Sequence, residues 1–244
     1  MTKTLTPARL VIREDGTPFS AEFGDVYHSI DGGPGQAEFV FLAGNGLPER
    51  WRHRHSFTVL ETGFGTGLNF LATWKAWLTD SARCFHLRFV SIEKHPFGAD
   101  DLGTLHQRWP ELALYSEQLC AAWPLPETGL HTLQFDQGRV TLDLHFGDAA
   151  DVLPRLKKQA DAFYLDGFAP GKNPEMWSPA IFQALAAAAT PGATLATWTV
   201  AATVRKGLAE AGFSLWKSAG YGRKREMLRG ALRGDPSPDR GSRD

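Results

Sequence analysis

Residues 57–70 read Phe-Thr-Val-Leu-Glu-Thr-Gly-Phe-Gly-Thr-Gly-Leu-Asn-Phe and carry the strongest fold signal in the chain. Residues 57–60 form an apolar, strand-like run that leads directly into three glycines spaced two apart. From Leu68 to Leu78, apolar residues recur at helical spacing. Glycine permits a sharp turn. The stretch therefore predicts a strand, a tight turn and a helix, the repeating unit of parallel α/β sheets.

The same alternation continues along the chain. Further strands are expected at residues 87–92, 130–135, 140–146, 162–165 and 194–198, with a last hairpin at 213–216 and 226–228. Helices are expected at residues 149–156, 178–189 and 201–211. We therefore expect an α/β domain over residues 51–232, of Rossmann-like type, with a mostly parallel sheet.

The flanking and inserted segments have a different character. Residues 1–50 are rich in turn formers with short extended pieces, such as residues 38–42, and predict a β-rich extension of strands and loops packed on the core. Residues 96–138 are too long for a simple crossover and predict a largely helical insertion. Residues 233–244 are polar and rich in Pro and Gly, which is typical of a flexible tail.

Composition excludes several classes of protein. The 244 residues carry 26 Lys and Arg against 27 Asp and Glu, so nucleic acid could be bound only through local clusters of charge. The two cysteines, Cys84 and Cys120, form no CxxC pair, which disfavours a zinc knuckle or a disulfide scaffold. The amino terminus has no apolar signal segment, and the longest apolar run is too short to cross a membrane. We expect a cytoplasmic protein that does not bind membranes.

The glycine turn can bind a ligand through free N–H groups at the start of the following helix. A dinucleotide fingerprint, G-x-G-x-x-G, fails because Leu68 takes the last position, and no Gly-Lys-Ser/Thr follows to cradle phosphate. The turn therefore suits a cofactor without phosphates, whose ammonium the preceding Glu61 could hold. The alternative is a tight turn that binds nothing.

Acidic residues follow the next strands, at the edge where ligands of α/β sheets bind. Glu93 could accept hydrogen bonds from both ribose hydroxyls of a nucleoside, or it could be a solvated surface residue. Asp148 could accept from an adenine amine, or it could cap the helix that follows it, or both.

The stretch at residues 161–177, Asp-Ala-Phe-Tyr-Leu-Asp-Gly-Phe-Ala-Pro-Gly-Lys-Asn-Pro-Glu-Met-Trp, is the most specific in the chain. An apolar strand delivers Asp166 to the carboxyl edge of the sheet, where it could bind an ammonium, accept its proton and orient the lone pair of the nitrogen. Phe168 and Trp177 could sandwich a base or contact a methyl sulfonium. The alternative is a capped turn with packed aromatic residues.

With these motifs, the sequence resembles the methyltransferase of the MnmC/MnmD family. The likeness runs from about residue 18 to residue 230. Its matching stretches are Asp25-Val26-Tyr27 and residues 41–45, 61–70, 91–94, 165–177, 195–197 and 222–227. It implies a class I S-adenosylmethionine-dependent methyltransferase fold with a seven-stranded, mostly parallel sheet. Thr62 and Gly171 are mild departures, where Ser and Ala are expected.

The resemblance implies an activity. The family methylates the amine of 5-aminomethyl-2-thiouridine at the wobble position of tRNA, with S-adenosyl-L-methionine as cofactor. Asp166 matches its proposed catalytic carboxylate. The residues expected at the cofactor are Glu61, Gly63, Phe64, Gly65, Gly67, Asn69, Glu93, Lys94, Asp148 and Asp166. In many relatives an FAD-dependent oxidase domain supplies the substrate, and this chain would have to rely on a fused or separate one.

A tRNA anticodon loop would require positive charge and stacking surfaces. The residues expected at the substrate are Phe168, Lys172, Asn173, Trp177, Arg223, Lys224 and Arg225. Other basic clusters are residues 50–55, Lys157-Lys158 and Arg205-Lys206. His53 and His55 alternate with arginines, which repel a cation, so we expect no metal site. Alternatives to tRNA methylation are a small-molecule or protein amine as substrate, or a binding module without activity.

Overall fold

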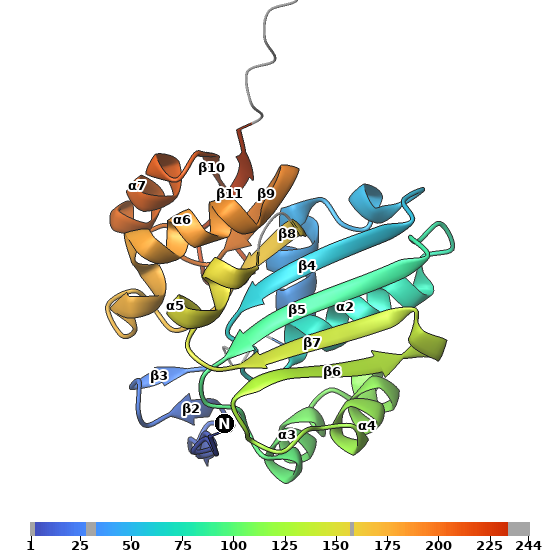
Figure 1. Ribbon diagram of the computed structural model, residues 1–244. Helices are drawn as coiled ribbons and strands as arrows, with labels where there is room; N and C mark the ends of the chain where they lie inside the picture. The colour runs from blue at the N-terminus through green and yellow to red at the C-terminus, as the bar shows by residue number, and fades with distance from the viewer. Residues whose placement is uncertain (1–2, 28–32, 157–158, 234–244) are drawn as a thin grey trace, which may run out of the picture.

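The computed structural model describes residues 3–27, 33–156 and 159–233, so Lys157-Lys158 and the predicted tail at 234–244 lie outside the described residues. Its centre is a mixed sheet of eight strands in the order β10-β11-β9-β8-β4-β5-β7-β6 (Figure 1). The strands are β4 (Ser56–Thr62), β5 (His86–Glu93), β6 (Gly129–Phe135), β7 (Val140–Phe146), β8 (Ala160–Leu165), β9 (Ala189–Thr197), β10 (Phe213–Ala219) and β11 (Glu226–Leu232). Each predicted strand of the α/β domain is present.

The five central strands are parallel, from β9 to β7. The hairpin of β10 and β11 runs antiparallel at one edge. The resemblance implied seven strands, but the sheet has eight. The strand predicted at residues 130–135 is β6, which lies in the insertion and pairs antiparallel with β7 along its full length at the other edge. The rest of the insertion is helical, as predicted.

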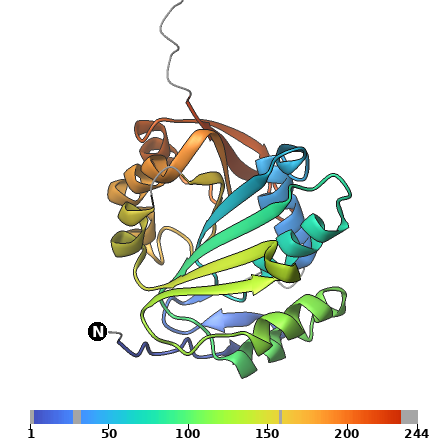
Figure 2. The same cartoon turned by 45° about the vertical axis from the view of Figure 1, so that its right-hand side comes forward.

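Helices cover both faces of the sheet (Figures 1 and 2). They are α2 (Leu68–Thr79), α3 (Ala99–His106), α4 (Ala113–Ala121), α5 (Ala149–Val152), α6 (Pro179–Ala188) and α7 (Ala202–Glu210). Short 3₁₀ turns lie at Pro110–Leu112, Asp136–Gly138, Leu153–Arg155 and Pro174–Trp177. Successive strand residues face opposite sides: Val59 joins the core beneath α2, whereas Leu60 joins the core beneath α5 and α6.

The amino-terminal extension forms two parts. A small antiparallel sheet of β1 (Val11–Ile12), β2 (Pro18–Ser20) and β3 (Asp25–Val26) lies beside the carboxyl ends of the central strands (Figure 1). The second part is helical and comprises α1 (Pro34–Ala37), a π-helical turn (Glu38–Leu42) and 3₁₀ turns at Ala43–Asn45 and Glu49–Trp51. The extended conformation expected at residues 38–42 is therefore wrong. Ala37, Val40 and Phe41 are buried at helical spacing, which lets one helical face pack on the sheet.

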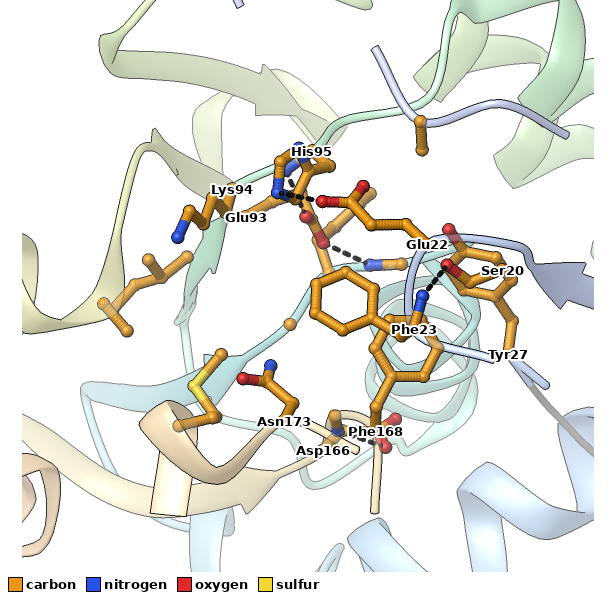
Figure 3. A pocket seen from close by; sticks show the side chains of 18 of the residues that line it. Ser20, Glu22, Phe23, Tyr27, Glu93, Lys94, His95, Asp166, Phe168 and Asn173 are labelled. Carbon is orange, nitrogen blue, oxygen red and sulfur yellow. Dashed lines mark hydrogen bonds and ion pairs between the residues drawn. The ribbon is translucent and has the colours of Figure 1, made fainter. Parts of the chain in front are cut away.

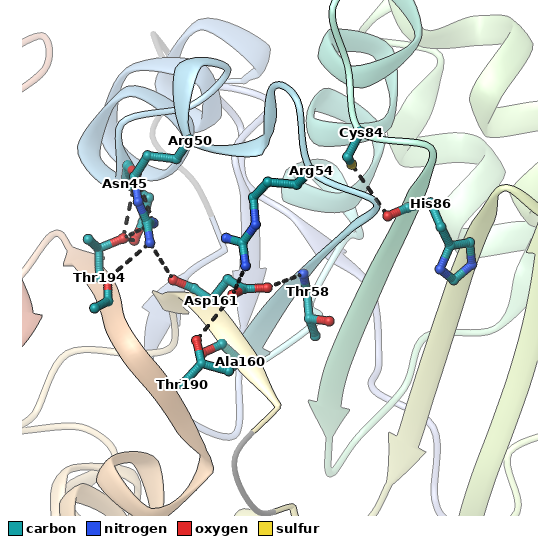
Figure 4. A network of polar contacts seen from close by, with 11 residues as sticks. Asn45, Arg50, Arg54, Thr58, Cys84, His86, Ala160, Asp161, Thr190 and Thr194 are labelled. Atoms are coloured by element: carbon teal, nitrogen blue, oxygen red, sulfur yellow. Dashed lines mark hydrogen bonds and ion pairs between the residues drawn. The ribbon is translucent and has the colours of Figure 1, made fainter.

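The basic residues at 50–55 have a structural role at the amino ends of the strands (Figure 4). Arg54 pairs with the buried Asp161 at 2.9 Å, and Arg50 donates to the Asp161 carbonyl and to Thr194 Oγ1. The second carboxylate oxygen of Asp161 accepts from the Thr58 N–H. These contacts tie the extension to β4, β8 and β9 at the end of the sheet away from the predicted site.

Candidate active site at the carboxyl edge of the sheet

A cavity of about 680 Å³ lies at the carboxyl ends of β4, β5, β7 and β8 (Figure 3). This volume is within the usual range for pockets that hold small molecules. Of the residues predicted at the cofactor, the cavity is lined by Gly63, Phe64, Gly65, Asn69, Glu93, Lys94, Asp148 and Asp166. Four separate loops of the sheet thus converge on one space, as the positions of these residues after successive strands predict.

The glycine turn adopts the conformation that its composition predicts. Gly63, Gly65 and Gly67 all have positive φ, at +88°, +53° and +73°. Gly67 is the residue before α2, and a Cβ added there would lie 2.7 Å from the ring of Phe64. Any side chain at this position would displace Phe64, so only glycine allows both the turn and the packing. Gly67 therefore shapes the turn without itself lining the cavity.

Glu93 is fixed in orientation by two backbone groups. Its Oε2 accepts from the Gly65 N–H at 2.9 Å, and its Oε1 accepts from the His95 N–H at 2.7 Å (Figure 3). Each carboxylate oxygen can accept a further hydrogen bond. Glu93 is therefore a preorganised acceptor pair facing the cavity, and it also ties the glycine turn to β5.

Glu61 differs from the prediction. Its side chain is completely buried and is not among the described residues that line either cavity. It accepts from Ser91 Oγ at 2.6 Å and from Asn69 Nδ2 at 2.9 Å. Burial raises the pKa of Glu61 well above its usual range. Glu61 therefore holds Asn69, which does face the cavity, and its predicted contact with the cofactor stays a prediction.

Asp166 is linked to the same network. Asn69 Nδ2 donates to Asp166 Oδ2 at 2.8 Å, and the Gly167 N–H donates to Asp166 Oδ1 at 2.8 Å. Burial raises the pKa of Asp166 to about 6, while these two hydrogen bonds work in the opposite direction. Asn69 thus bridges two acidic side chains with a single amide nitrogen and fixes the position of the Asp166 carboxylate.

Lys94 and Asp148 form an ion pair at the cavity wall. Lys94 Nζ lies 2.8 Å from Asp148 Oδ2, and the pair lowers the pKa of Asp148 and raises that of Lys94. Asp148 Oδ1 also accepts from the Ala150 N–H, so it caps α5, which confirms one of its two predicted roles. Its predicted contact with adenine stays a prediction.

A second cavity, of about 380 Å³, adjoins the first. Asp166, Gly167, Val26, Tyr27 and Gln36 line both, so they form a shared wall. The remaining lining residues of the second cavity are Asp25, Leu165, Ala169, Pro170, Trp177, Thr197, Trp198, Thr199, Tyr221, Gly222, Arg223 and Lys224. The carboxylate of Asp166 thus lies where an acidic, glycine-lined cavity meets one with aromatic walls and basic residues.

The residues predicted at the substrate divide between these cavities. Trp177, Arg223 and Lys224 line the second cavity, whereas Phe168 and Asn173 line the first. Lys172 and Arg225 are exposed and are not among the described residues that line either. Phe168 and Trp177 line different cavities, and the predicted sandwich of a base between them, or their contact with a methyl sulfonium, stays a prediction.

The ring of Phe168 stacks on that of Phe23, with ring centroids 4.6 Å apart, and Trp177 Nε1 donates to the Phe168 carbonyl.

The amino-terminal extension contributes site residues that the sequence reasoning missed. Phe23 and Tyr27 close the first cavity, and Asp25 Oδ2 accepts from the Ala169 N–H at 3.1 Å. Asp25 and Tyr27 belong to a tripeptide already singled out by the family resemblance, which was the available signal. Its spatial role required the fold, because more than a hundred residues separate it from the Asp166 loop.

Comparison with known families agrees with this geometry. Residues 110–233 match the model of a family described as S-adenosyl-L-methionine-dependent methyltransferase. The chain belongs to this methyltransferase family.

Relatives of known name are similar in sequence to this methyltransferase over nearly its whole length. It is 58% identical over 230 residues to a protein of Azoarcus sp. (strain BH72) named tRNA 5-methylaminomethyl-2-thiouridine biosynthesis bifunctional protein MnmC, covering 94% of this chain and 36% of the relative. The protein of the same name from Thiobacillus denitrificans is 58% identical over 228 residues, covering 93% of this chain and 37% of that protein. The expected likeness to the MnmC/MnmD family is confirmed. The chain spans little more than a third of these relatives.

Among solved structures, MNMC2 from Aquifex aeolicus matches with a TM-score of 0.73 at 23% identity, covering 94% of this chain and 72% of that one. This match confirms the fold of the methyltransferase.

The first cavity fits S-adenosyl-L-methionine, the cofactor of the family. Six carboxylate residues line it, namely Glu22, Glu93, Asp148, Asp151, Asp166 and Glu175, against the cations Arg9 and Lys94 and the imidazole of His95. Such a lining suits a cofactor with a cationic sulfonium and ammonium and repels a pyrophosphate. Glu93 would hold the ribose, and the glycine turn with Asn69 would hold the amino-acid tail.

In the part of the chain that the structure describes, no group of three or more His, Cys, Asp or Glu residues is arranged to hold a metal ion. No helix there has the length and apolar character needed to cross a membrane.

Proposed function

We propose that this methyltransferase transfers a methyl group from S-adenosyl-L-methionine to the amine of 5-aminomethyl-2-thiouridine at the wobble position of tRNA, giving 5-methylaminomethyl-2-thiouridine. The observation that carries the proposal is the place of Asp166, whose carboxylate borders both cavities. The names of the relatives contain the nucleoside that this reaction would produce, which supports the proposal.

The chemistry requires an unprotonated amine next to an electrophilic methyl group. The bound cofactor supplies that methyl group on its sulfonium. A primary alkyl amine resembles a lysine side chain and is largely protonated near neutral pH. Asp166 is ionised at that pH, so it can bind the ammonium from the second cavity and accept a proton from it. A pKa raised to about 6 makes Asp166 a better proton acceptor than an ordinary carboxylate.

Positioning contributes as much as proton transfer. The hydrogen bonds from Gly167 and Asn69 occupy one position on each Asp166 oxygen and leave others for the amine. Asp166 can therefore aim the nitrogen lone pair toward the first cavity.

The second cavity suits an extruded base. Trp177 and Trp198 supply aromatic surface, and Arg223 and Lys224 supply positive charge for the sugar-phosphate backbone. A base in a single-stranded anticodon loop can be splayed out at low energetic cost. We also propose a cytoplasmic location and an FAD-dependent oxidase, fused or separate, as the supplier of the substrate. The relatives are named bifunctional and are nearly three times as long as the matched region.

A methyl-transfer assay tests the function. Labelled S-adenosyl-L-methionine is mixed with the protein and with tRNA from cells that lack this methyltransferase, and the RNA is then digested to nucleosides. We expect the label in 5-methylaminomethyl-2-thiouridine. If the protein binds the cofactor but labels no RNA, the tRNA proposal is wrong, and a small-molecule or protein amine becomes the leading substrate class.

A further inference from the structure

Two aromatic side chains, one of them on the wall of the second cavity, form a surface beside that cavity. Phe39, in the helical part of the extension, is 40% exposed. Its ring centroid lies 5.7 Å from that of Tyr221, with the ring planes inclined by 48°. Tyr221 lines the second cavity. The two rings, here called the aromatic shelf, therefore continue the cavity wall outward to the surface.

The aromatic shelf packs against the backbone of α1. A Cβ added at Gly35 would lie 2.7 Å from the hydroxyl oxygen of Tyr221, so Tyr221 rests directly against the backbone of α1. Gly35 and Phe39 are four residues apart and share one helical face. Tyr221 thus packs between the backbone at Gly35 and the exposed ring of Phe39.

Positive charge adjoins the aromatic shelf. Tyr221 is followed by Gly222 and then by the exposed Arg223, Lys224 and Arg225 in the turn between β10 and β11. Exposed aromatic rings next to a run of basic residues are typical of surfaces that bind single-stranded nucleic acid, where bases stack and phosphates pair with cations. A surface that docks a protein would be expected to have fewer charges near its centre.

We propose that the aromatic shelf stacks the anticodon-loop nucleotide next to the one that enters the second cavity. This inference rests on the proposed function, since it takes the occupant of the second cavity to be a base of single-stranded RNA. Stacking at Phe39 would stabilise the splayed conformation of the loop by replacing the base–base stacking that is lost on extrusion.

The experiment compares Phe39→Ala, Phe39→Trp and the matched control Phe85→Ala. Phe85 is also an exposed phenylalanine, at 62%, but it stacks on His55 near the amino end of β5, away from both cavities. Methyl transfer is measured with an anticodon stem-loop that contains 5-aminomethyl-2-thiouridine and, separately, with the free nucleoside. Cofactor binding is measured for each variant.

For Phe39→Ala we expect KM for the stem-loop to rise by about tenfold or more, as for other base–aromatic contacts, with kcat and cofactor affinity unchanged. Phe39→Trp should restore KM, Phe85→Ala should not alter it, and KM for the free nucleoside should be the same in all variants. An unchanged KM for the stem-loop in Phe39→Ala overturns the proposal and favours a protein partner for the aromatic shelf.

A binding measurement separates this proposal from the proposed function. Stem-loops with 2-aminopurine on either side of the wobble position report stacking as fluorescence quenching. Quenching by the wild-type protein that Phe39→Ala abolishes supports the aromatic shelf even if no methyl group is transferred. If the wild-type protein methylates the stem-loop and neither probe is quenched, the proposed function stands and the aromatic shelf is wrong.

Discussion

Asp166 has a raised pKa and lines both cavities. Removal of its carboxylate should lower the rate of methyl transfer more than it weakens the binding of RNA. We expect Asp166→Asn to lower kcat by about 10²- to 10⁴-fold, the usual contribution of a positioned base. Because Asp166 must be ionised, kcat/KM of the wild-type protein should fall about tenfold per pH unit below pH 6. Rates of the wild-type protein and of Asp166→Asn, measured from pH 5 to 8, test the loss of kcat in the variant and the fall of kcat/KM in the wild-type protein. Unchanged turnover of the variant would disprove the role.

The same pKa has a consequence for stability. Burial on folding raises the pKa of Asp166 from the ordinary range of an aspartate to about 6, so the folded protein holds this proton more tightly than the unfolded chain. Its contribution to stability is present at low pH and is lost as the pH rises toward 6. Relative to Asp166→Asn, the wild-type protein should lose about 2 kcal/mol of unfolding free energy between pH 4 and pH 7. Denaturant unfolding of both proteins at several pH values measures this difference in unfolding free energy. The same pH dependence of the unfolding free energy in both proteins would contradict the prediction.

The sequence predicted which residues lie at the strand ends of the site. It did not predict where each side chain points. Asp166 and Glu93 follow apolar strands, and parallel strands bring their carboxyl ends together. Glu61 lies within β4, and the sequence does not reveal that its side chain points into the interior toward Asn69 and Ser91. The acid was identified, but its role as a partner of Asn69 depends on packing across two strands.

At the level of elements, the insertion braces the glycine turn through α3. His106 Nε2 lies 2.7 Å from the Thr66 carbonyl, which can only accept, so Nε2 carries a proton and Nδ1 accepts from Ser116 Oγ at 2.7 Å. Burial lowers the pKa of His106, which keeps the imidazole neutral. Thr66 lines the first cavity, so His106 positions the wall of the cofactor site.

His106→Ala should therefore weaken cofactor binding. Loss of one buried hydrogen bond predicts about a fivefold rise in Kd for S-adenosyl-L-methionine, with kcat at saturating cofactor little changed. Calorimetric titration measures Kd. His131→Ala is the matched control, because His131 also contacts a backbone carbonyl, that of Glu127 at 2.7 Å, but belongs to the edge strand β6. Equal effects of the two substitutions would rule out a specific brace.

Helices and strands could be predicted from the sequence wherever a periodic pattern of apolar residues extended over a long segment. The strands and helices after residue 56 lie within a few residues of their predicted positions. The prediction of an extended segment at residues 38–42 was wrong because a short apolar run fits a buried strand and a buried helix equally well. The burial of Ala37, Val40 and Phe41 on one face settles the choice, and that burial is a property of the folded chain.

On the scale of the whole molecule, charge is segregated while the net charge is only -1. Carboxylates gather in the first cavity, and basic residues gather at the β10–β11 turn. We expect Lys224→Ala with Arg225→Ala to reduce the slope of log K for stem-loop RNA against log salt by about 0.7 for each phosphate contact removed. Lys206→Ala is the control, since Lys206 pairs with Glu210 on α7. An unchanged slope in the double variant would exclude these residues from the RNA contact.

The wall that the two cavities share has a kinetic consequence. Because Tyr27, Gln36 and Asp166 separate the two spaces, neither ligand has to pass through the site of the other. We expect spent cofactor to leave while RNA remains bound, so that S-adenosylhomocysteine competes with S-adenosyl-L-methionine but not with RNA. A retained RNA can then meet a second methyl donor. We therefore expect the space around the nitrogen, and not the departure of the RNA, to decide whether the product stops at one methyl group.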